Sequence, residues 1–216
     1  MRSETAWDGQ APGSPQELLG AESGHEGEQL MSHLGIILNE AAKDDVHTGE
    51  GSHRTTIATA PDPDAAARKA VALVEAGADS IELCGATGPV WQARVLASVG
   101  DRASVGVILY GFESLDSVQS FKAGFELGED LTASMIYLQP GADPTTDRMT
   151  VEDESGRTNF IAVPDAAAAV TVAASEAAAG ARLIELYGGI DPKVQAEVIA
   201  ATGDGRVPIG VIARAR

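Results

Sequence analysis

The sequence is poor in basic side chains, and this shortage restricts its partners. Its 216 residues include 15 Lys and Arg against 32 Asp and Glu, which gives a formal charge of -17 at pH 7. A chain this acidic repels phosphate backbones and anionic lipid headgroups unless a local basic patch offsets the charge. We therefore expect no nucleic acid and no membrane among its partners. A small-molecule substrate is the expected partner, and a homo-oligomer stays open.

Cysteine and long apolar runs are also scarce. Cys84 is the single cysteine, so an internal disulfide cannot form, and no CxxC or HExxH spacing marks a metal site. No apolar run approaches the roughly 18–20 residues that cross a bilayer, and the first residues do not resemble a signal peptide. GxGxxG and P-loop motifs are missing as well. These features predict a cytoplasmic protein that uses no cofactor, and whether it binds a metal stays open.

Aromatic residues make up only 4% of the chain, whereas glycine occurs 24 times. A core built from Ala, Val, Ile and Leu at close backbone approach suits tightly packed α/β layers. Residues 1–32 differ from the rest, because they are rich in Gly, Ser, Glu and Gln and keep no helical or strand period. We predict a disordered acidic leader there.

An internal duplication organises the remaining sequence. Arg54–Asp101 aligns without gaps with Arg157–Asp204 at an offset of 103, and nearly half of the aligned positions are identical. After one inserted residue SVGVIL matches PIGVIA, and upstream HLGIIL is aligned with MIYLQP. Two units are therefore predicted, 33–109 and 134–216, joined by a linker at 110–133.

Each unit is predicted to fold as β-β-α-β-α-β. Asp62 and Asp165 stand where they can cap the first helix of each unit, and Pro89 and Pro192 occupy the first turn of the second helix. Two right-handed crossovers in each unit predict an α/β fold with a mainly parallel sheet in two pseudo-symmetric units. Strands are expected at 34–38, 55–60, 80–84 and 105–109, and at 135–138, 158–163, 183–187 and 208–213. The linker is predicted to hold one amphipathic helix, either a connector or a lid over a site between the halves.

The third strand of each unit carries a glutamate in an apolar setting, IELCG in one copy and IELYG in the other. Alternation along a strand places Glu82 with Cys84 on one face, and Glu185 with Tyr187 on the equivalent face. A buried carboxylate is costly unless it is paired, protonated or bound to a ligand. These four residues are therefore candidates for a site.

Two interpretations of the glutamates stay open. They are structural carboxylates, bonded to backbone N–H groups or to an arginine such as Arg54 or Arg157, or they are a catalytic pair. In the second case Glu82 and Glu185 meet in one cleft, one protonated and the other ionised, and perform general acid/base chemistry. Arg54 and Arg157 then become candidates for substrate binding.

Cys84 and its counterpart Tyr187 are candidate substrate contacts. Cys84 is either a small buried hydrophobe or a nucleophile, and sequence alone favours the former. Because the two copies differ chemically at this position, we infer one working site and one modified copy.

The loop QPGADPTTDR in the second unit is a further candidate. It is either a capped turn with a surface ion pair or a substrate loop. In the second case Arg148 binds a carboxylate or enolate oxygen, while Asp143 or Asp147 moves a proton or binds a metal. Gln139, at the start of the loop, is added as a candidate substrate-binding residue. The histidines at 33, 47 and 53 have no recognised ligand spacing.

From residue 33 to the end of the chain, these motifs resemble those of a known family. MIYLQPGADPTTDR, IELYGGIDP and VPIGVIA, with IELCGATGP and SVGVIL, resemble a tandem version of a family of short bacterial proteins of unknown function. The family pattern is GADPxxHR, IELCGGxGP and VPVGVV, and Asp147 stands where the family has histidine. The resemblance implies the fold and supplies no activity.

Two functions are compatible with these residues. The first is a small cofactor-independent enzyme of isomerase, cyclase or lyase type that acts on a small organic metabolite, in bacterial specialised metabolism. The alternative is a non-catalytic small-molecule-binding or assembly protein. The alternative predicts that Glu82 and Glu185 have all their hydrogen bonds satisfied internally.

Overall fold

Ten strands and five α-helices make up the part of the chain that the structure, a computed structural model, describes: residues 32–41, 43–49, 53–153 and 156–215. The first repeat contains β1 (Ser32–Asn39), β2 (Val46–Thr48), β3 (His53–Ala60), α1 (Pro63–Glu75), β4 (Ser80–Leu83), α2 (Pro89–Val99) and β5 (Ser104–Tyr110). After α3 (Leu115–Glu126) the second contains β6 (Leu131–Leu138), β7 (Arg148–Asp153), β8 (Gly156–Val163), α4 (Ala166–Ala178), β9 (Leu183–Tyr187), α5 (Pro192–Ala201) and β10 (Ile209–Ala215). Of the leader predicted at 1–32, residues 1–31 lie outside the described part of the chain.

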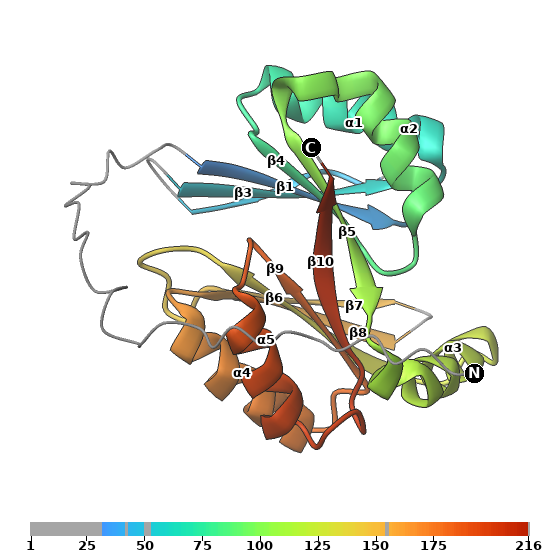
Figure 1. Cartoon of the computed structure of the whole chain (residues 1–216), viewed down its shortest axis with the longest axis vertical. Coiled ribbons are helices and arrows are strands. Elements are labelled where there is room, and N and C mark those ends of the chain that lie inside the picture. The colour runs from blue at the N-terminus through green and yellow to red at the C-terminus, as the bar shows by residue number, and fades with distance from the viewer. Residues whose placement is uncertain (1–31, 42, 50–52, 154–155, 216) are drawn as a thin grey trace, which may run out of the picture. The chain divides into compact units, whose positions relative to one another are not determined.

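All ten strands belong to one sheet with the order β2-β3-β1-β4-β5-β10-β9-β6-β8-β7. Within each repeat the strands are parallel except for the edge strands β2 and β7, and the repeats join through the antiparallel pair β5 and β10. Figure 1 shows these two strands running through the middle, with α1 and α2 covering one half and α4 and α5 the other. The predicted α/β fold with two related units and a mainly parallel sheet is confirmed.

The helix starts follow from local chemistry. The side chain of Asp62 accepts a hydrogen bond from the backbone N–H of Ala65 at 2.7 Å, and that of Asp165 accepts one from Ala168 at 2.8 Å. Each bond satisfies an N–H group that the first turn of a helix leaves without a partner. The predicted caps of α1 and α4 are confirmed.

The register of the sheet corrects one detail of the duplication. Ser32 pairs with His53, and Leu131 pairs with Gly156, so residues of β1 correspond to residues of β6 at an offset of 99. HLGIIL is therefore equivalent to TASMIY, and the alignment with MIYLQP is wrong. The loop after the first strand is four residues longer in the second repeat, and it contains β7, which, like β2, was not predicted.

The buried side chains form three clusters. In the first repeat, one face of the strands packs against α1 and α2, and in the second repeat one face packs against α4 and α5. The opposite faces of both repeats share the third cluster, which includes Leu34, Ile36, Ile57 and Cys84 from one repeat and Tyr137, Phe160 and Tyr187 from the other. Because the described residues belong to one compact unit, this shared face is the interior between the repeats.

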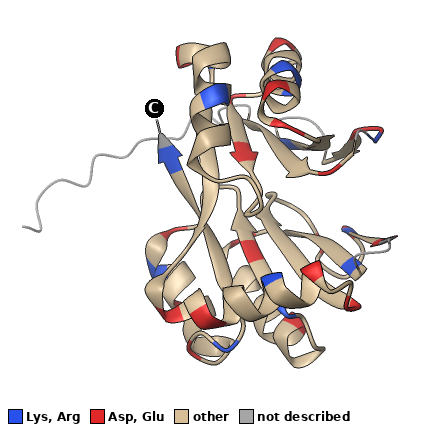
Figure 2. Ribbon diagram, turned by 90° about the vertical axis from the view of Figure 1, so that its right-hand side faces the viewer, with Lys and Arg blue, Asp and Glu red and all other residues tan. Residues whose placement is uncertain are grey.

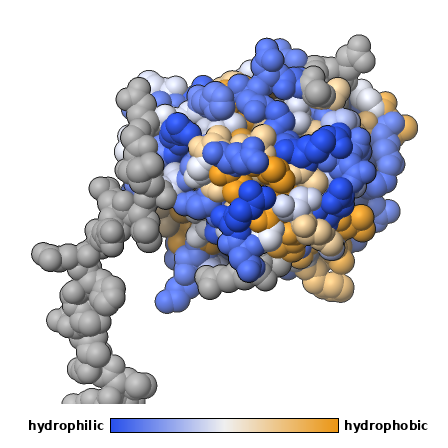
Figure 3. Space-filling model, turned by 90° about the horizontal axis from the view of Figure 1, so that it is seen from above, coloured by the Kyte–Doolittle hydropathy of each residue, from blue (hydrophilic) through white to orange (hydrophobic). Residues whose placement is uncertain are grey.

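The surface agrees with the acidic composition. Figure 2 shows acidic residues outnumbering basic ones on both repeats. Over α1 and α2 the surface is mainly hydrophilic, with a limited apolar area between the polar groups (Figure 3). Among the helices of the described part, none combines the length and the apolar character needed to cross a membrane.

We predict that Asp165→Ala lowers the free energy of unfolding by about 1 kcal/mol, because the substitution removes the side-chain cap of α4. Chemical denaturation with circular dichroism measures this change. Glu197→Ala, on the exposed face of α5, is the control and should alter stability by less than about 0.5 kcal/mol. Equal losses in the two variants would contradict a capping role.

Candidate functional site

The two glutamates of the third strands bind backbone amides of the opposite repeat. Glu82 on β4 accepts a hydrogen bond from the N–H of Gly188 at 2.8 Å, and Glu185 on β9 accepts one from the N–H of Gly85 at 3.0 Å. Both pairs are related by the offset of 103, so the same bond is made twice, once in each direction. Glu82 is 0% exposed and Glu185 3% exposed. The carboxylates therefore connect the repeats through their shared interior.

Each glutamate has further partners on the central strands, and these differ between repeats. Arg214 on β10 donates to Glu82 at 2.5 Å, whereas Tyr110 on β5 donates to Glu185 at 2.7 Å. The hydroxyl of Tyr187 also donates to Glu185. Arg214 and Tyr110 occupy equivalent positions, so duplication followed by substitution gave one carboxylate a cation and the other two phenols.

Two glycines make these cross-strand contacts possible. Gly106 pairs with Glu82 on one side and Arg214 on the other, and Gly210 lies in the same way between Glu185 and Tyr110. A Cβ at Gly106 would lie 2.5 Å from Ile212, and one at Gly210 would lie 2.6 Å from Ile108. The glycines of the VGV and IGV motifs therefore leave room for Arg214 to reach Glu82 and for Tyr110 to reach Glu185 across the strand between them.

The environments of the two carboxyls differ electrostatically. Burial raises the pKa of Glu82, while Arg214 and the Gly188 N–H act in the opposite direction. Burial also raises the pKa of Glu185, opposed only by hydrogen bonds from Tyr187, Tyr110 and Gly85. Glu82 thus faces a cation, and Glu185 is surrounded by neutral donors.

Cys84 and Tyr187 lie in the interior beside Glu185. Burial and the nearby carboxyl of Glu185 raise the pKa of the Cys84 thiol to about 12, and the Asn39 N–H donates to its sulfur at 3.3 Å. A thiol with such a pKa stays protonated and is a poor nucleophile. Burial and the same carboxyl raise the pKa of Tyr187, which keeps its hydroxyl as a donor.

Two cavities lie between the repeats and meet at one residue, Gln139. One has a volume of about 280 Å³ and is lined by Thr48, Gly49 and Ile57 of the first repeat and by Tyr137, Gln139, Thr146, Asp147, Arg148, Met149 and Phe160 of the second. The other has a volume of about 220 Å³ and is lined by Ser32, Leu34, His53, Arg54 and Thr55 and by Leu138, Gln139, Pro140 and Gly188. Neither Glu82 nor Glu185 lines them. We refer to the two cavities together as the inter-repeat cleft.

The loop after β6 is a structured turn at the edge of this cleft. Asp143 is exposed, and its carboxylate accepts hydrogen bonds from Thr145 N at 2.9 Å and Oγ1 at 2.7 Å, which lower its pKa. Asp147 accepts from Asp143 N at 2.8 Å. Arg148 does bind a carboxylate, that of Glu176 on α4 at 3.1 Å. Its guanidinium is therefore engaged within the chain.

The remaining arginine candidates lie away from the glutamates. Arg157 forms a surface ion pair with Glu152 at 2.7 Å. The Arg54 guanidinium lies 3.4 Å from Nδ1 of His33 and 3.5 Å from the carbonyl oxygen of Ala76. The arginine that pairs with a glutamate is Arg214, because it lies two strands from Glu82 and only Gly106 of β5 stands between them.

The sequence did not identify four partners of the glutamates: Tyr110, Arg214 and the backbone amides of Gly85 and Gly188. Extending the alignment of SVGVIL with PIGVIA by one residue would have placed Tyr110 opposite Arg214. α3 is present where a linker helix was expected, and its Ser117 hydroxyl donates to the Gly205 carbonyl at 2.7 Å. No residue of α3 lines the inter-repeat cleft. Within the described residues no three His, Cys, Asp or Glu side chains converge on a metal position.

Comparison with known proteins gives a family and little else. The model of a family of unknown function, DUF6506, matches residues 36–123 and again 131–215. No curated protein matches the sequence. A crystal structure of a carbohydrate transporter from Acidothermus cellulolyticus in complex with myo-inositol is similar with a TM-score of 0.27 and 12% identity, over 83% of this chain and 73% of that one.

We predict that Arg214→Met destabilises the protein at neutral pH, because it leaves the buried Glu82 carboxylate without a cation. The expected loss is about 2 kcal/mol, less than the roughly 3–5 kcal/mol of a fully buried pair, since Arg214 is 37% exposed. Without the arginine the pKa of Glu82 in the folded state rises further above its unfolded value of 4.5. The loss should therefore shrink as the pH falls toward 4.5.

Chemical denaturation at several pH values measures this dependence. Arg68→Met, an exposed position of α1, is the control and should have little effect at any pH. A loss for Arg214→Met that is independent of pH would contradict the assigned ion pair.

Proposed function

The chain belongs to the family of unknown function DUF6506 in two tandem copies, and we propose that it binds a small, uncharged, hydroxyl-rich metabolite in the inter-repeat cleft. The observation that carries this proposal is that two cavities, each lined by both repeats, share the buried side chain of Gln139. Pockets between related units are common ligand sites, because each unit contributes different polar groups to one space.

The lining of the cleft favours a neutral ligand. Thr48 donates to Gln139 at 3.1 Å, and its hydroxyl also lies 3.1 Å from that of Tyr137, so an amide and two hydroxyls form one polar cluster. Of the two arginines that line the cleft, Arg148 is paired with Glu176, and Arg54 donates to the Ala76 carbonyl and toward His33. Hydroxyl and carbonyl groups of a ligand can exchange hydrogen bonds with this cluster, while Phe160 supplies an apolar wall.

The amide of Gln139 has capacity for a ligand. Its Oε1 accepts from Thr48, and its Nε2 has no hydrogen-bond partner among the described residues. With 7% of the residue exposed, this amide gains from a ligand acceptor. The reciprocal glutamate bonds hold the repeats at fixed separation, so the cleft is formed before a ligand arrives.

We expect Gln139→Met to weaken binding of such a ligand by about tenfold or more, since losing a buried hydrogen bond costs roughly 1–3 kcal/mol. A thermal-shift screen of monosaccharides, inositols and short polyols would identify a ligand, and isothermal titration would measure its affinity. The screen should include hydroxy acids of similar size as charged competitors.

Gln119→Met, on the exposed face of α3, is the matched control and should bind like the unmodified chain. A ligand that binds Gln139→Met and the control equally well does not occupy this cleft. Preferential binding of the charged acids in the cleft would contradict the neutral ligand.

A second candidate function is acid/base catalysis of isomerase, cyclase or lyase type. The observation in its favour is the different surroundings of two otherwise equivalent carboxyls, Glu82 beside a cation and Glu185 among tyrosine hydroxyls. Such pairs let one carboxyl act ionised and the other protonated. Neither carboxyl lines the cleft, so this function also needs the loops after β4 and β9 to open.

The test of catalysis uses Glu185→Gln, which keeps an acceptor for Gly85 and Tyr110 but cannot transfer a proton. If Glu185 is catalytic, incorporation of deuterium from D₂O into a ligand found in the screen should fall by about 10²-fold or more. The melting temperature should stay within a few degrees of the unmodified chain. Unchanged deuterium incorporation would exclude Glu185 as the acid or base.

A further inference from the structure

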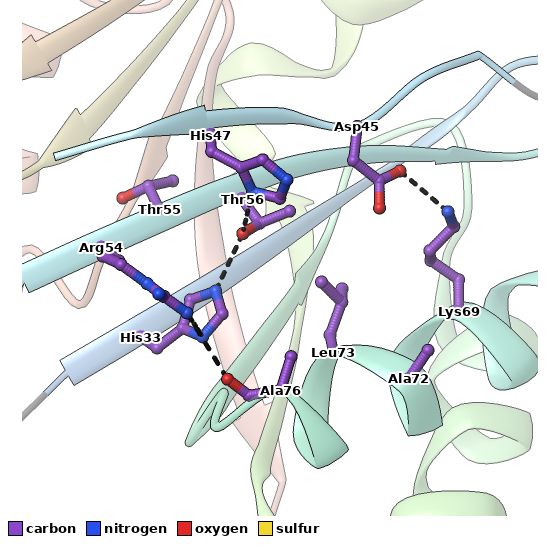
Figure 4. A pocket seen from close by; sticks show the side chains of 10 residues that line it. All are labelled: His33, Asp45, His47, Arg54, Thr55, Thr56, Lys69, Ala72, Leu73 and Ala76. Carbon is purple, nitrogen blue, oxygen red and sulfur yellow. Dashed lines mark hydrogen bonds and ion pairs between the residues drawn. The ribbon is translucent and has the colours of Figure 1, made fainter. Parts of the chain in front are cut away.

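A third cavity lies in the first repeat between the sheet edge and α1, and it shares Arg54 and Thr55 with the lining of the inter-repeat cleft. It has a volume of about 280 Å³ and is lined by His33, Asp45, His47, Arg54, Thr55, Thr56, Lys69, Ala72, Leu73 and Ala76. Figure 4 shows side chains from β1, β2 and β3 on one wall and from α1 on the other. We call it the edge pocket.

A hydrogen-bonded row crosses the strand wall of the edge pocket. The Thr56 hydroxyl lies 2.8 Å from Nε2 of His33 and 3.0 Å from Nδ1 of His47 (Figure 4). Arg54 donates toward Nδ1 of His33, so His33 presents its Nε2–H to Thr56. Thr56 can then donate to Nδ1 of His47, which leaves Nε2–H of His47 as a donor for a ligand.

The charge in the edge pocket is opposite to that of the chain. Arg54 and Lys69 supply two cations, and Asp45, 2.8 Å from Lys69, is the single carboxylate among the lining residues. His33 is 7% exposed, and burial together with Arg54 lowers its pKa. A positive pocket in a protein with a formal charge of -17 favours a small anion.

The second repeat has a carboxylate of its own at the equivalent place. Leu73 of α1 corresponds to Glu176 of α4, at the offset of 103. Glu176 is 7% exposed and accepts hydrogen bonds from Ser134 at 2.8 Å, from Asn159 at 2.9 Å and from Arg148 at 3.1 Å. Asn159 corresponds to Thr56 of the edge pocket. In the second repeat, the position equivalent to the edge pocket therefore holds the Glu176 carboxylate, surrounded by hydrogen-bond donors.

The differences between the repeats at this place are coordinated. Gly35 stands opposite Leu73, and a Cβ at Gly35 would lie 2.9 Å from the Leu73 side chain, whereas the second repeat has Ser134 opposite Glu176. His47 corresponds to Thr150, whose hydroxyl donates to Asn159 at 2.9 Å. Where the second repeat has an internal carboxylate bound by Arg148, the first repeat has a cavity, two histidines, an apolar side chain and, at the position of Arg148, Asp45 paired with Lys69.

We propose that the edge pocket binds a small aliphatic carboxylate, whose carboxylate group takes the place that Glu176 occupies in the second repeat. Arg54 and His47 are the donors, together with the N–H groups of the Lys69 ammonium that its pair with Asp45 leaves over. Ala72 and Leu73 of α1, with Ala76 directly after this helix, form an apolar wall for the hydrocarbon part. At about 30 Å³ per non-hydrogen atom, the share of a water molecule in the liquid, the pocket holds roughly nine such atoms. A six-carbon acid such as hexanoate fits this limit.

The experiment titrates the full chain with sodium hexanoate, with hexanamide as the neutral isostere and inorganic phosphate as the alternative oxyanion. Isothermal titration should give an affinity for hexanoate at least about tenfold higher than for either comparison compound. Imidazole resonances of His33 and His47 should shift in NMR spectra when hexanoate is added. Equal affinity for hexanamide, stronger binding of phosphate, or unchanged histidine resonances would overturn the proposal.

Leu73→Glu supplies the carboxylate of the second repeat and should weaken hexanoate binding by more than about tenfold. Leu115→Glu, on the exposed side of α3, adds the same charge elsewhere and should leave binding unchanged. Lys69→Met, which removes a cation without adding a charge to the pocket, provides a second variant if Leu73→Glu does not fold. Full hexanoate binding by a folded Leu73→Glu or Lys69→Met chain would overturn the proposal. Ligands of the inter-repeat cleft should respond to Gln139→Met and not to these variants.

Discussion

The hydrogen bond between a buried glutamate and a loop amide of the opposite repeat is the contact on which the rest of the structure depends. It is made twice, from Glu82 to Gly188 and from Glu185 to Gly85, and each bond to a carboxylate contributes roughly 1.5–3 kcal/mol. The bonds align the carboxyl ends of β4 and β9, and the apolar faces of both repeats then close over one interior. Because the two bonds fix the distance between the repeats, the inter-repeat cleft stays open at the rim of this interior.

The two repeats carry different residues at two pairs of equivalent positions. Arg214 and Tyr110 give the two glutamates different electrostatic surroundings, and Leu73 and Glu176 give one repeat a pocket and the other an internal ion pair. In both cases the side chain in one repeat indicates which chemical groups can be accommodated at the equivalent position of the other repeat. A single-copy dimer of identical chains could not separate these roles.

The sequence predicted the helices, most strands and the pseudo-symmetry, because caps, glycines and apolar periods are local signals. Asp62 and Asp165 cap as expected, and the cost of burying a carboxylate correctly required partners for Glu82 and Glu185. Local signals in the sequence could not identify those partners, because Gly188, Gly85 and Arg214 approach the glutamates only when the two repeats pack together. β2 and the offset of β6 were missed since a three-residue edge strand and a changed loop length leave no period to detect.

Amide hydrogen exchange at Gly85 and Gly188, followed by NMR, tests the reciprocal bonds most directly. Both residues follow strands in loops, where amides ordinarily exchange quickly unless they are bonded. We expect both amides to be protected nearly as well as those of β4 and β9, and Glu82→Leu and Glu185→Leu, which remove the acceptor, each to reduce protection chiefly at the amide that the glutamate binds. Fast exchange at both glycines in the unmodified chain would contradict this expectation.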